Sequence, residues 1–247
     1  MSYITWLVCG RNLISMRIEM PIGLIIGHTI TLFLVLTIGV VCLWIATHVL
    51  KANREVQQTY EALAVLIQHS HPQTQKHLAR VAHTAQELAR ELRLSKRRAI
   101  LVGQAALLHD IGKIAIDERI LDKPSKLNEE EFRVVRNHPE YGASILDSLA
   151  NAKMVAQWIH LHHERIDGLG YPLGLGGESI PIEARIISVV DAFDAMTGLD
   201  GNEASRTYRN PISAEDALAE LQRCQGTQFC PLVVSKFAKI LAQEERE

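Results

Sequence analysis

Residues 107–113 read Leu107-Leu108-His109-Asp110-Ile111-Gly112-Lys113 and stand at the end of an apolar helical run. The adjacent imidazole and carboxylate can both bind metal, and the two oxygens of Asp110 can bridge two ions. If the helix continues, Lys113 lies on the same face one turn later, where its ammonium could meet a phosphate. A His-Asp pair alone is more often a solvated surface pair, so a metal site needs further ligands elsewhere in the chain.

The composition limits the classes of function. The chain has 247 residues, of which 22% are charged, and its formal net charge is −2. That length suffices for one sizeable domain and an appendage, and the charge balance offers no basic surface for a nucleic-acid polymer. Cysteines occur at four positions, Cys9, Cys42, Cys224 and Cys230, without a C-x-x-C pair. We therefore expect neither a disulfide framework nor a zinc–thiolate site.

An uncharged segment precedes the helical region. No Asp, Glu, Lys or Arg occurs in residues 21–50, a run of about 30 residues, and roughly 20 suffice for a helix to cross a bilayer. Buried core helices rarely run so long without a charge, and the run is long for a cleaved signal peptide. Residues 21–50 are therefore predicted to form one transmembrane helix, preceded by a short segment, 1–20. Basic residues flank both ends, so the charge pattern does not set the orientation.

Residues 51–70 are predicted to continue as a helical linker. Val56, Tyr60, Leu63 and Ile67 follow a 3–4 spacing and form one apolar stripe. The stripe could pair with that of a second chain and make a homodimer, or it could dock on the chain's own domain. The segment is too short to show a heptad pattern, so both alternatives stay open.

Residues 71–247 carry a succession of helix signals and no alternating strand pattern. The signals are a helical stripe from Leu78 to Leu92, helix caps at Ser95, Asn128 and Ser213, and helix-opening prolines at Pro139 and Pro231. Residues 152–163 and 182–196 are also expected to be helical, and the glycine-rich residues 167–177 must form a loop. The domain is therefore predicted to be all-α.

Seven side chains in this region share a chemical type that suits metal binding. They are His77, His109, Asp110, His138, His162, His163 and Asp191. Asp191 lies in a strongly apolar helix, where a carboxylate is costly unless it is paired or metal-bound. Each residue alone is more often structural, but five His and two Asp without Cys describe a site for two divalent ions, Fe or Mn. The adjacent His162 and His163 cannot point the same way on a helix, so we expect them to serve two neighbouring metals.

A second motif follows the double histidine. It reads His162-His163-Glu164-Arg165-Ile166-Asp167-Gly168-Leu169-Gly170-Tyr171-Pro172. Glycines let the backbone come close to a ligand, and Tyr171 can stack on a base or bond a phosphate. Asp167, Gly168 and Tyr171 are therefore candidate substrate-binding residues. Asp-Gly and Tyr-Pro are also common in ordinary turns, so the attachment to the double histidine makes the motif specific.

These motifs together resemble the HD-GYP family, the branch of the HD-domain metal phosphohydrolases that degrades cyclic di-GMP in bacteria. The resemblance runs from about residue 71 to the end of the chain and includes Gly226-Thr227-Gln228-Phe229. It implies an HD-domain helical bundle in which the seven side chains hold two metals and Asp110 bridges them. Lys113 would contact the scissile phosphate or the bridging hydroxide, and Arg206 and Arg209 would hold substrate phosphates.

The resemblance implies hydrolysis of cyclic di-GMP to pGpG, with further cleavage to GMP. Cyclic di-GMP is made in the cytoplasm, so the chain would be a single-pass protein of the bacterial inner membrane with a cytoplasmic catalytic domain, 71–247. Two alternatives stay open. One is a catalytically weak module that binds cyclic di-GMP and signals through its anchor. The other is an HD phosphohydrolase of another nucleotide, including a mixed cyclic dinucleotide.

Three features depart from the family pattern. Gln73 replaces a glutamate that in some members helps to hold a third metal, so we expect two metals. Extra residues separate Thr197 from Arg206, which changes how the arginine motif would be placed over the substrate. Cys230 stands where the family usually has an acidic residue, so we expect a lost helix cap there.

Overall fold

The computed structural model describes residues 3–9, 12–18, 22–70, 74–149, 152–198 and 211–244. The chain divides into two compact units, Met1–Glu55 and Val56–Glu247. The long helix α1 (Ile22–Ser70) begins in the first unit and ends in the second.

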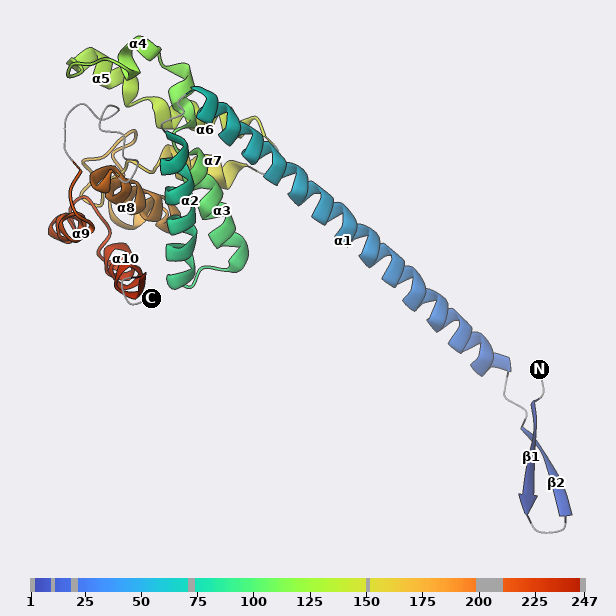
Figure 1. The fold of residues 1–247 in the computed structure, drawn as a ribbon. Coiled ribbons are helices and arrows are strands. Elements are labelled where there is room, and N and C mark those ends of the chain that lie inside the picture. The colour runs from blue at the N-terminus through green and yellow to red at the C-terminus, as the bar shows by residue number, and fades with distance from the viewer. Residues whose placement is uncertain are drawn as a thin grey trace. The chain divides into compact units, whose positions relative to one another are not determined.

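The first unit begins with a β-hairpin. Strands β1 (Tyr3–Cys9) and β2 (Asn12–Ile18) pair antiparallel, from Tyr3 opposite Ile18 to Cys9 opposite Asn12 (Figure 1). No strand is expected for residues 1–20 from the sequence, because apolar and polar residues do not alternate regularly there. The hairpin is therefore an element that the prediction missed.

The apolar part of α1 is exposed. Residues 26–65 are long and apolar enough to include a membrane span by length and composition, and an 18-residue part of them has a mean hydropathy of 2.5 and no buried residue. Its hydroxyl groups bond to the helix itself, at 2.8–2.9 Å from a carbonyl three or four residues earlier, for Thr29, Thr31, Thr37 and Thr47. This back-bonding leaves no hydroxyl donor of these threonines open, which a helix in hydrocarbon requires.

The second unit is helical, and Figure 1 shows its helices gathered into one bundle. Its elements are α2 (Thr74–Glu91), α3 (Lys96–Leu108), the 3-10 helix η1 (Ile111–Ala115), α4 (Glu118–Leu121), α5 (Glu129–Val135), α6 (His138–Asp147), α7 (Lys153–His160), the 3-10 helix η2 (Gly177–Ser179), α8 (Ile182–Thr197), α9 (Ala214–Arg223) and α10 (Pro231–Glu244). Helix α2 packs along α3 and α8, and α6 packs against α7 and η1. The prediction of an all-α domain is confirmed.

One continuous core holds these helices together. Leu78 and Val81 of α2, Val102 of α3, Ile187 of α8 and Phe237 of α10 are fully buried in it. Burial of side chains of this size contributes roughly 1.5–3 kcal/mol each. The core thereby fixes α2, α3 and α8, which are three of the elements that carry predicted metal ligands.

The last turns of α1 contribute to the same core. Tyr60 and Ala64 are buried in it, and Val56 and Leu63 pack against it. Three members of the predicted apolar stripe therefore dock on the chain's own domain. This was one of the two alternatives for the segment, and it leaves only the other faces of α1 for contact with a second chain.

The predicted helix caps are confirmed. The Ser95 and Ser213 hydroxyls accept backbone N–H groups at the starts of α3 and α9, at 3.3 and 3.0 Å. Asn128 and Glu131 form the reciprocal capping box that opens α5. Helix α7 ends earlier than predicted, at His160, and the double histidine follows in a turn.

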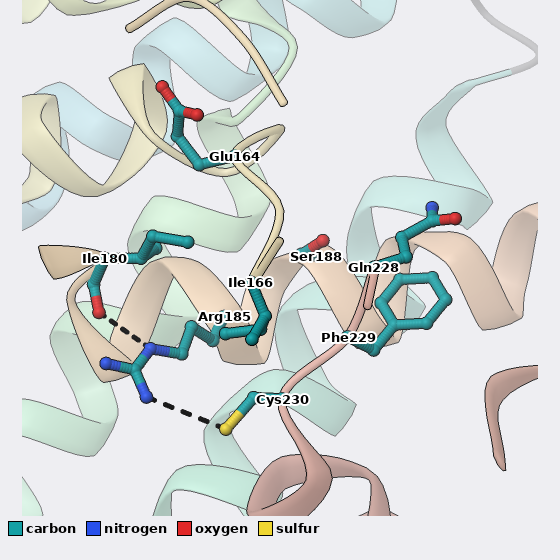
Figure 2. A pocket seen from close by; sticks show the side chains of 8 residues that line it. All are labelled: Glu164, Ile166, Ile180, Arg185, Ser188, Gln228, Phe229 and Cys230. Carbon is teal, nitrogen blue, oxygen red and sulfur yellow. Dashed lines mark hydrogen bonds between the residues drawn. The ribbon is translucent and has the colours of Figure 1, made fainter. Parts of the chain in front are cut away.

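Cys230 lies directly before α10 and is buried. Its Sγ accepts a hydrogen bond from Nη1 of Arg185 at 3.7 Å, and Nε of Arg185 donates to the Ile180 carbonyl at 2.7 Å. Figure 2 shows both contacts beside a narrow crevice. No carboxylate among the described residues pairs with Arg185. The guanidinium thus meets a thiol at the position where the family pattern places an acid.

Replacement of Cys230 by Asp is expected to stabilise the second unit. The carboxylate would cap the first turn of α10 and pair with Arg185, which together contribute about 1–2 kcal/mol to the free energy of unfolding. The measurement is the melting temperature of the whole protein in detergent, with Cys230→Ala as the control. An Asp variant that melts no higher than the Ala variant would contradict this assignment.

Candidate metal centre

The seven predicted ligands come from separate elements and meet at one place. His77 lies on α2, His109 and Asp110 follow α3, His138 opens α6, His162 and His163 follow α7, and Asp191 lies on α8. Their ligand atoms form three overlapping groups, within each of which the atoms lie within 4.8 Å of one another. The groups are His77 with His109 and Asp191, His109 with Asp110 and His162, and His138 with His162 and His163.

Asp110 connects the two ends of this cluster. Its Oδ2 lies 3.5 Å from Nε2 of His109, and its Oδ1 lies 3.4 Å from Nε2 of His138. The ammonium of Lys113 lies 2.6 Å from Oδ2. Burial by itself raises the pKa of this carboxyl, but Lys113 and the two histidines outweigh burial and hold the pKa well below its usual range. Asp110 is therefore an anion that presents one oxygen to each side of the cluster.

Three of the histidines are oriented by helix ends. Nδ1 of His109, His138 and His162 lies 2.7, 2.8 and 2.5 Å from the carbonyl three residues earlier. Those carbonyls belong to the last turns of α3, α5 and α7, where the helix leaves acceptors unused. A carbonyl only accepts, so Nδ1 carries a proton in each of these rings, and a ring that is neutral keeps its lone pair on Nε2.

Two of these three Nε2 atoms lack a partner among the described residues, whereas Nε2 of His109 faces Asp110 and Asp191, each at 3.5 Å. Burial alone lowers the pKa of His109, but the two aspartates outweigh burial and raise it. Nε2 of His138 and Nε2 of His162 are buried and make no hydrogen bond with any described residue. Burial and neighbouring imidazoles lower the pKa of His162 well below its usual value and that of His163 to about 3. A buried acceptor without a donor is costly unless a ligand fills the space. Neutral, inward-facing nitrogens beside two carboxylates fit divalent metal.

The adjacent imidazoles differ from the expectation for a helix. The ring centroids of His162 and His163 are 3.9 Å apart, and both rings belong to the group that contains His138. Because α7 ends at His160, both rings reach His138, and His162 also belongs to the group of His109 and Asp110. That the two histidines serve two neighbouring metals stays a prediction.

Asp194 is a residue of the site that the sequence motifs did not identify. Its Oδ2 lies 2.6 Å from Nδ1 of His77, and Arg80 donates to both of its oxygens at 2.7 and 2.9 Å. Nε2 of His77 faces Asp191 at 3.3 Å. Burial alone lowers the pKa of His77, but Asp191 and Asp194 outweigh burial and raise it to about 9. The spacing of three residues between the two aspartates on α8 was the available signal, since such residues share a helix face.

Substitution of Asp194 by Asn is expected to weaken metal binding without removing a ligand. The carboxylate fixes the ring of His77, and loss of such a partner typically costs 10–100-fold in metal affinity. The measurement is a metal titration of the purified protein. Glu87→Gln is the matched control. Glu87 lies on α2, the helix that carries His77, and its carboxylate pairs with the exposed His83 away from the cluster. Equal affinities of Asp194→Asn and wild type would refute the role.

Gly112 allows two ligand-bearing turns to touch. A Cβ on this residue would collide with the carbonyl oxygen of His138 and would lie 2.5 Å from the amide nitrogen of Gly142. These are backbone atoms, which cannot move aside without moving the ligand. The turn after Asp110 and the start of α6 can therefore approach only because residue 112 has no side chain.

Gly112→Ala is expected to abolish stable metal binding, because the collision must displace His138 or Asp110. The measurement is metal content after purification, by mass spectrometry. Gly177→Ala serves as the control, since Gly177 has a positive φ of 54° but a Cβ there would meet no atom within 4 Å. It should suffer backbone strain of about 1 kcal/mol and keep its metal. Full metal content in Gly112→Ala would show that the turns can separate.

The loop after the double histidine is held by two acids. Glu164 is buried and accepts the backbone N–H groups of Leu173 and Leu175 at 2.6 and 2.9 Å. The carboxylate of Asp167 accepts two bonds from Arg165, at 3.0 and 2.6 Å, and one from the Leu169 amide at 3.1 Å. Both acids are therefore already engaged in shaping the loop. A substrate contact by Asp167 stays a prediction.

The loop returns to the metal ligands through Gly170 and Tyr171. A Cβ on Gly170 would collide with the backbone of residues 163–165, so glycine is required at this approach. The Tyr171 ring stacks on His163, with centroids 4.8 Å apart and planes 29° apart. Gly168 has a positive φ of 77°, a backbone conformation that favours glycine. The predicted arginines Arg206 and Arg209, and Gln73, lie outside the described residues.

A sequence model of the HD domain family matches residues 61–233. The chain belongs to the HD domain family. The curated relative RpfG of Xanthomonas campestris, a cyclic di-GMP phosphodiesterase response regulator, is 40% identical over 192 residues, which cover 77% of this chain and 49% of RpfG. The 3'3'-cGAMP-specific phosphodiesterase 3 of Vibrio cholerae is 38% identical over 180 residues, 73% of this chain and 38% of that protein. The chain thus spans half or less of these relatives.

Solved HD domain structures share the fold. Bd1817, an HDG"Y"P protein from Bdellovibrio bacteriovorus, superposes with a TM-score of 0.53 at 21% identity, over 67% of this chain and 51% of that one. At 21% identity, this similarity is evidence for the fold alone, and it confirms the predicted HD-domain bundle. The family match and the curated relatives also confirm the resemblance to the HD-GYP type.

Proposed function

We propose that this HD domain protein is a metal-dependent phosphodiesterase that hydrolyses cyclic di-GMP. The observation that carries the proposal is the buried cluster in which Asp110 faces two groups of histidines. The names of relatives such as RpfG support the choice of substrate. The expected first product is the linear dinucleotide pGpG, with further cleavage to GMP.

The donor set suits two divalent ions, Fe or Mn. His77, His109 and Asp191 would hold one ion, His138, His162 and His163 the other, and Asp110 would contact both. When bound, such ions supply Lewis-acid activation of a water and neutralisation of a phosphate. Nitrogen and carboxylate donors without a thiolate support Fe or Mn over a zinc–thiolate site.

The chain's own residues would orient the substrate and balance its charge. Asp110 holds the ammonium of Lys113 at 2.6 Å, and the Lys113 side chain remains about a third exposed, so it can reach a phosphate at the mouth of the cluster. There it would stabilise the negative charge that develops during hydrolysis. The backbone bonds of the histidines keep their rings from rotating, so the ligand atoms need little rearrangement.

A mixed cyclic dinucleotide is the second candidate substrate. Its support is the 38% identity to the 3'3'-cGAMP-specific phosphodiesterase 3 of Vibrio cholerae. Both substrates share the sugar–phosphate ring and differ in one base, so the metal centre alone does not discriminate between them. The difference must lie in residues that contact the bases.

Residues 21–50 are proposed to anchor the protein in the bacterial inner membrane as a single pass, with the catalytic domain, 71–247, in the cytoplasm. The support is the length, hydropathy and exposure of the apolar part of α1. A homodimer through the 51–70 helix would have to use faces other than the docked stripe. The family's substrate is cytoplasmic, and this supports the orientation.

The test is product analysis with the whole protein in detergent, loaded anaerobically with Fe(II) or Mn(II). Cyclic di-GMP and 3',3'-cGAMP are incubated separately, and products are separated by chromatography. We expect pGpG from cyclic di-GMP, and a loss of about 10²–10³-fold or more in Asp110→Ala, because both halves of the cluster lose their shared oxygen donor.

Asp147→Ala is the control, since Asp147 lies at the exposed end of α6 away from the cluster. If the protein cleaves 3',3'-cGAMP in preference to cyclic di-GMP, the assigned substrate is wrong and the assigned enzyme class stands. If it binds either dinucleotide and cleaves neither with Fe(II) or Mn(II), it is a binding module and not a phosphodiesterase.

A further inference from the structure

We infer that Arg136 is a further substrate-binding residue, which takes the second phosphate of the cyclic dinucleotide while the metal cluster holds the first. The inference rests on the proposed function. Arg136 follows α5 and stands two residues before His138. Neither the family resemblance nor the ligand motifs point to it.

The guanidinium of Arg136 is fixed by aromatic rings. Its Cζ lies 4.4 Å from the centroid of the Tyr171 ring and 5.9 Å from that of Phe132. Tyr171 in turn stacks on His163. A planar cation held on an aromatic face loses little further freedom when it binds an anion, which favours tight contact.

The positive charge of Arg136 has no acidic partner among the residues that the structure describes. No ion pair or side-chain hydrogen bond links it to any of them, and only its two ring contacts are present. Arg80 and Arg165, by contrast, are neutralised by Asp194 and Asp167. A half-buried guanidinium without a counter-ion is a site for a phosphate, which it can bind with two N–H groups.

The position of Arg136 separates it from the first phosphate site. The Tyr171 ring stands between its guanidinium and His163, which is a member of the ligand cluster. Lys113, by contrast, is paired directly with Asp110 inside the cluster. A cyclic dinucleotide carries two phosphodiesters on opposite sides of its sugar–phosphate ring. When the cluster holds one phosphate, the second phosphate therefore lies on the side away from the cluster. We assign that second phosphate to Arg136, whose guanidinium is separated from the cluster by the Tyr171 ring.

The test measures binding, so that it does not depend on turnover. The probe is the non-hydrolysable bis-phosphorothioate analogue of cyclic di-GMP, titrated into the whole metal-loaded protein in detergent. Arg136→Met is expected to raise Kd by about 10–100-fold, the scale of a lost charge-assisted, bidentate contact. Arg136→Lys, which keeps the charge and loses the planar fork, should fall between Met and wild type.

Arg133→Met is the matched control. Arg133 lies on α5, three residues before Arg136, and it is exposed and reaches Glu129 at 3.9 Å. Its Kd should equal that of wild type. Metal content is measured in every variant, and it should not change in Arg136→Met.

Three results would overturn the assignment. One is an unchanged Kd in Arg136→Met, and another is a wild-type protein that does not bind the analogue. The third is a loss of metal together with affinity, which would make Arg136 a residue that only positions Tyr171 and His163. The proposed function fails separately, if wild type binds the analogue and leaves unmodified cyclic di-GMP intact.

Discussion

A carboxylate buried among histidines is the constraint on which the rest of this domain depends. Asp110 is 5% exposed, and an isolated charge at such a depth would cost several kcal/mol. Lys113 and the imidazoles around it compensate that cost only if α3, η1 and α6 meet at close range. The glycine at position 112 makes the approach possible, and the core beneath α2, α3 and α8 keeps the helices in place. Packing and electrostatics therefore impose the same arrangement.

Helix ends orient most of the histidine rings of the site. Three helices end one to three residues before a histidine, and Nδ1 of that histidine donates to one carbonyl of the last turn. This single hydrogen bond satisfies an open acceptor, places the proton on Nδ1 and turns Nε2 inward. The ring of His77 is oriented in another way. His77 lies within α2, where no helix-end carbonyl is open, and its Nδ1 bonds to the carboxylate of Asp194. Backbone and side-chain acceptors serve the same purpose at different places.

The sequence predicted those parts of the site that depend on chemical type. Five histidines and two aspartates could be selected before any geometry was known, and the caps at Ser95 and Asn128 follow from local rules. The parts that depend on where a helix stops could not be predicted as well. Whether His162 and His163 face one way depends on the end of α7 at His160, and helix ends vary by a few residues. The contact between Arg136 and Tyr171 depends on the segment after α5 meeting the glycine-rich loop, and no local sequence pattern predicts such a meeting.

The packing of Tyr60 and Ala64 has a consequence for how this protein can be divided. Although the apolar segment and the metal-binding segment look separable along the sequence, the last turns of α1 complete the core of the HD domain. A chain cut at residue 71 would lose Tyr60 and Ala64 and expose the part of the core that they cover. The connection to the apolar helix is thus also part of the core of the HD domain. A shortened protein meant to fold alone has to begin before Val56.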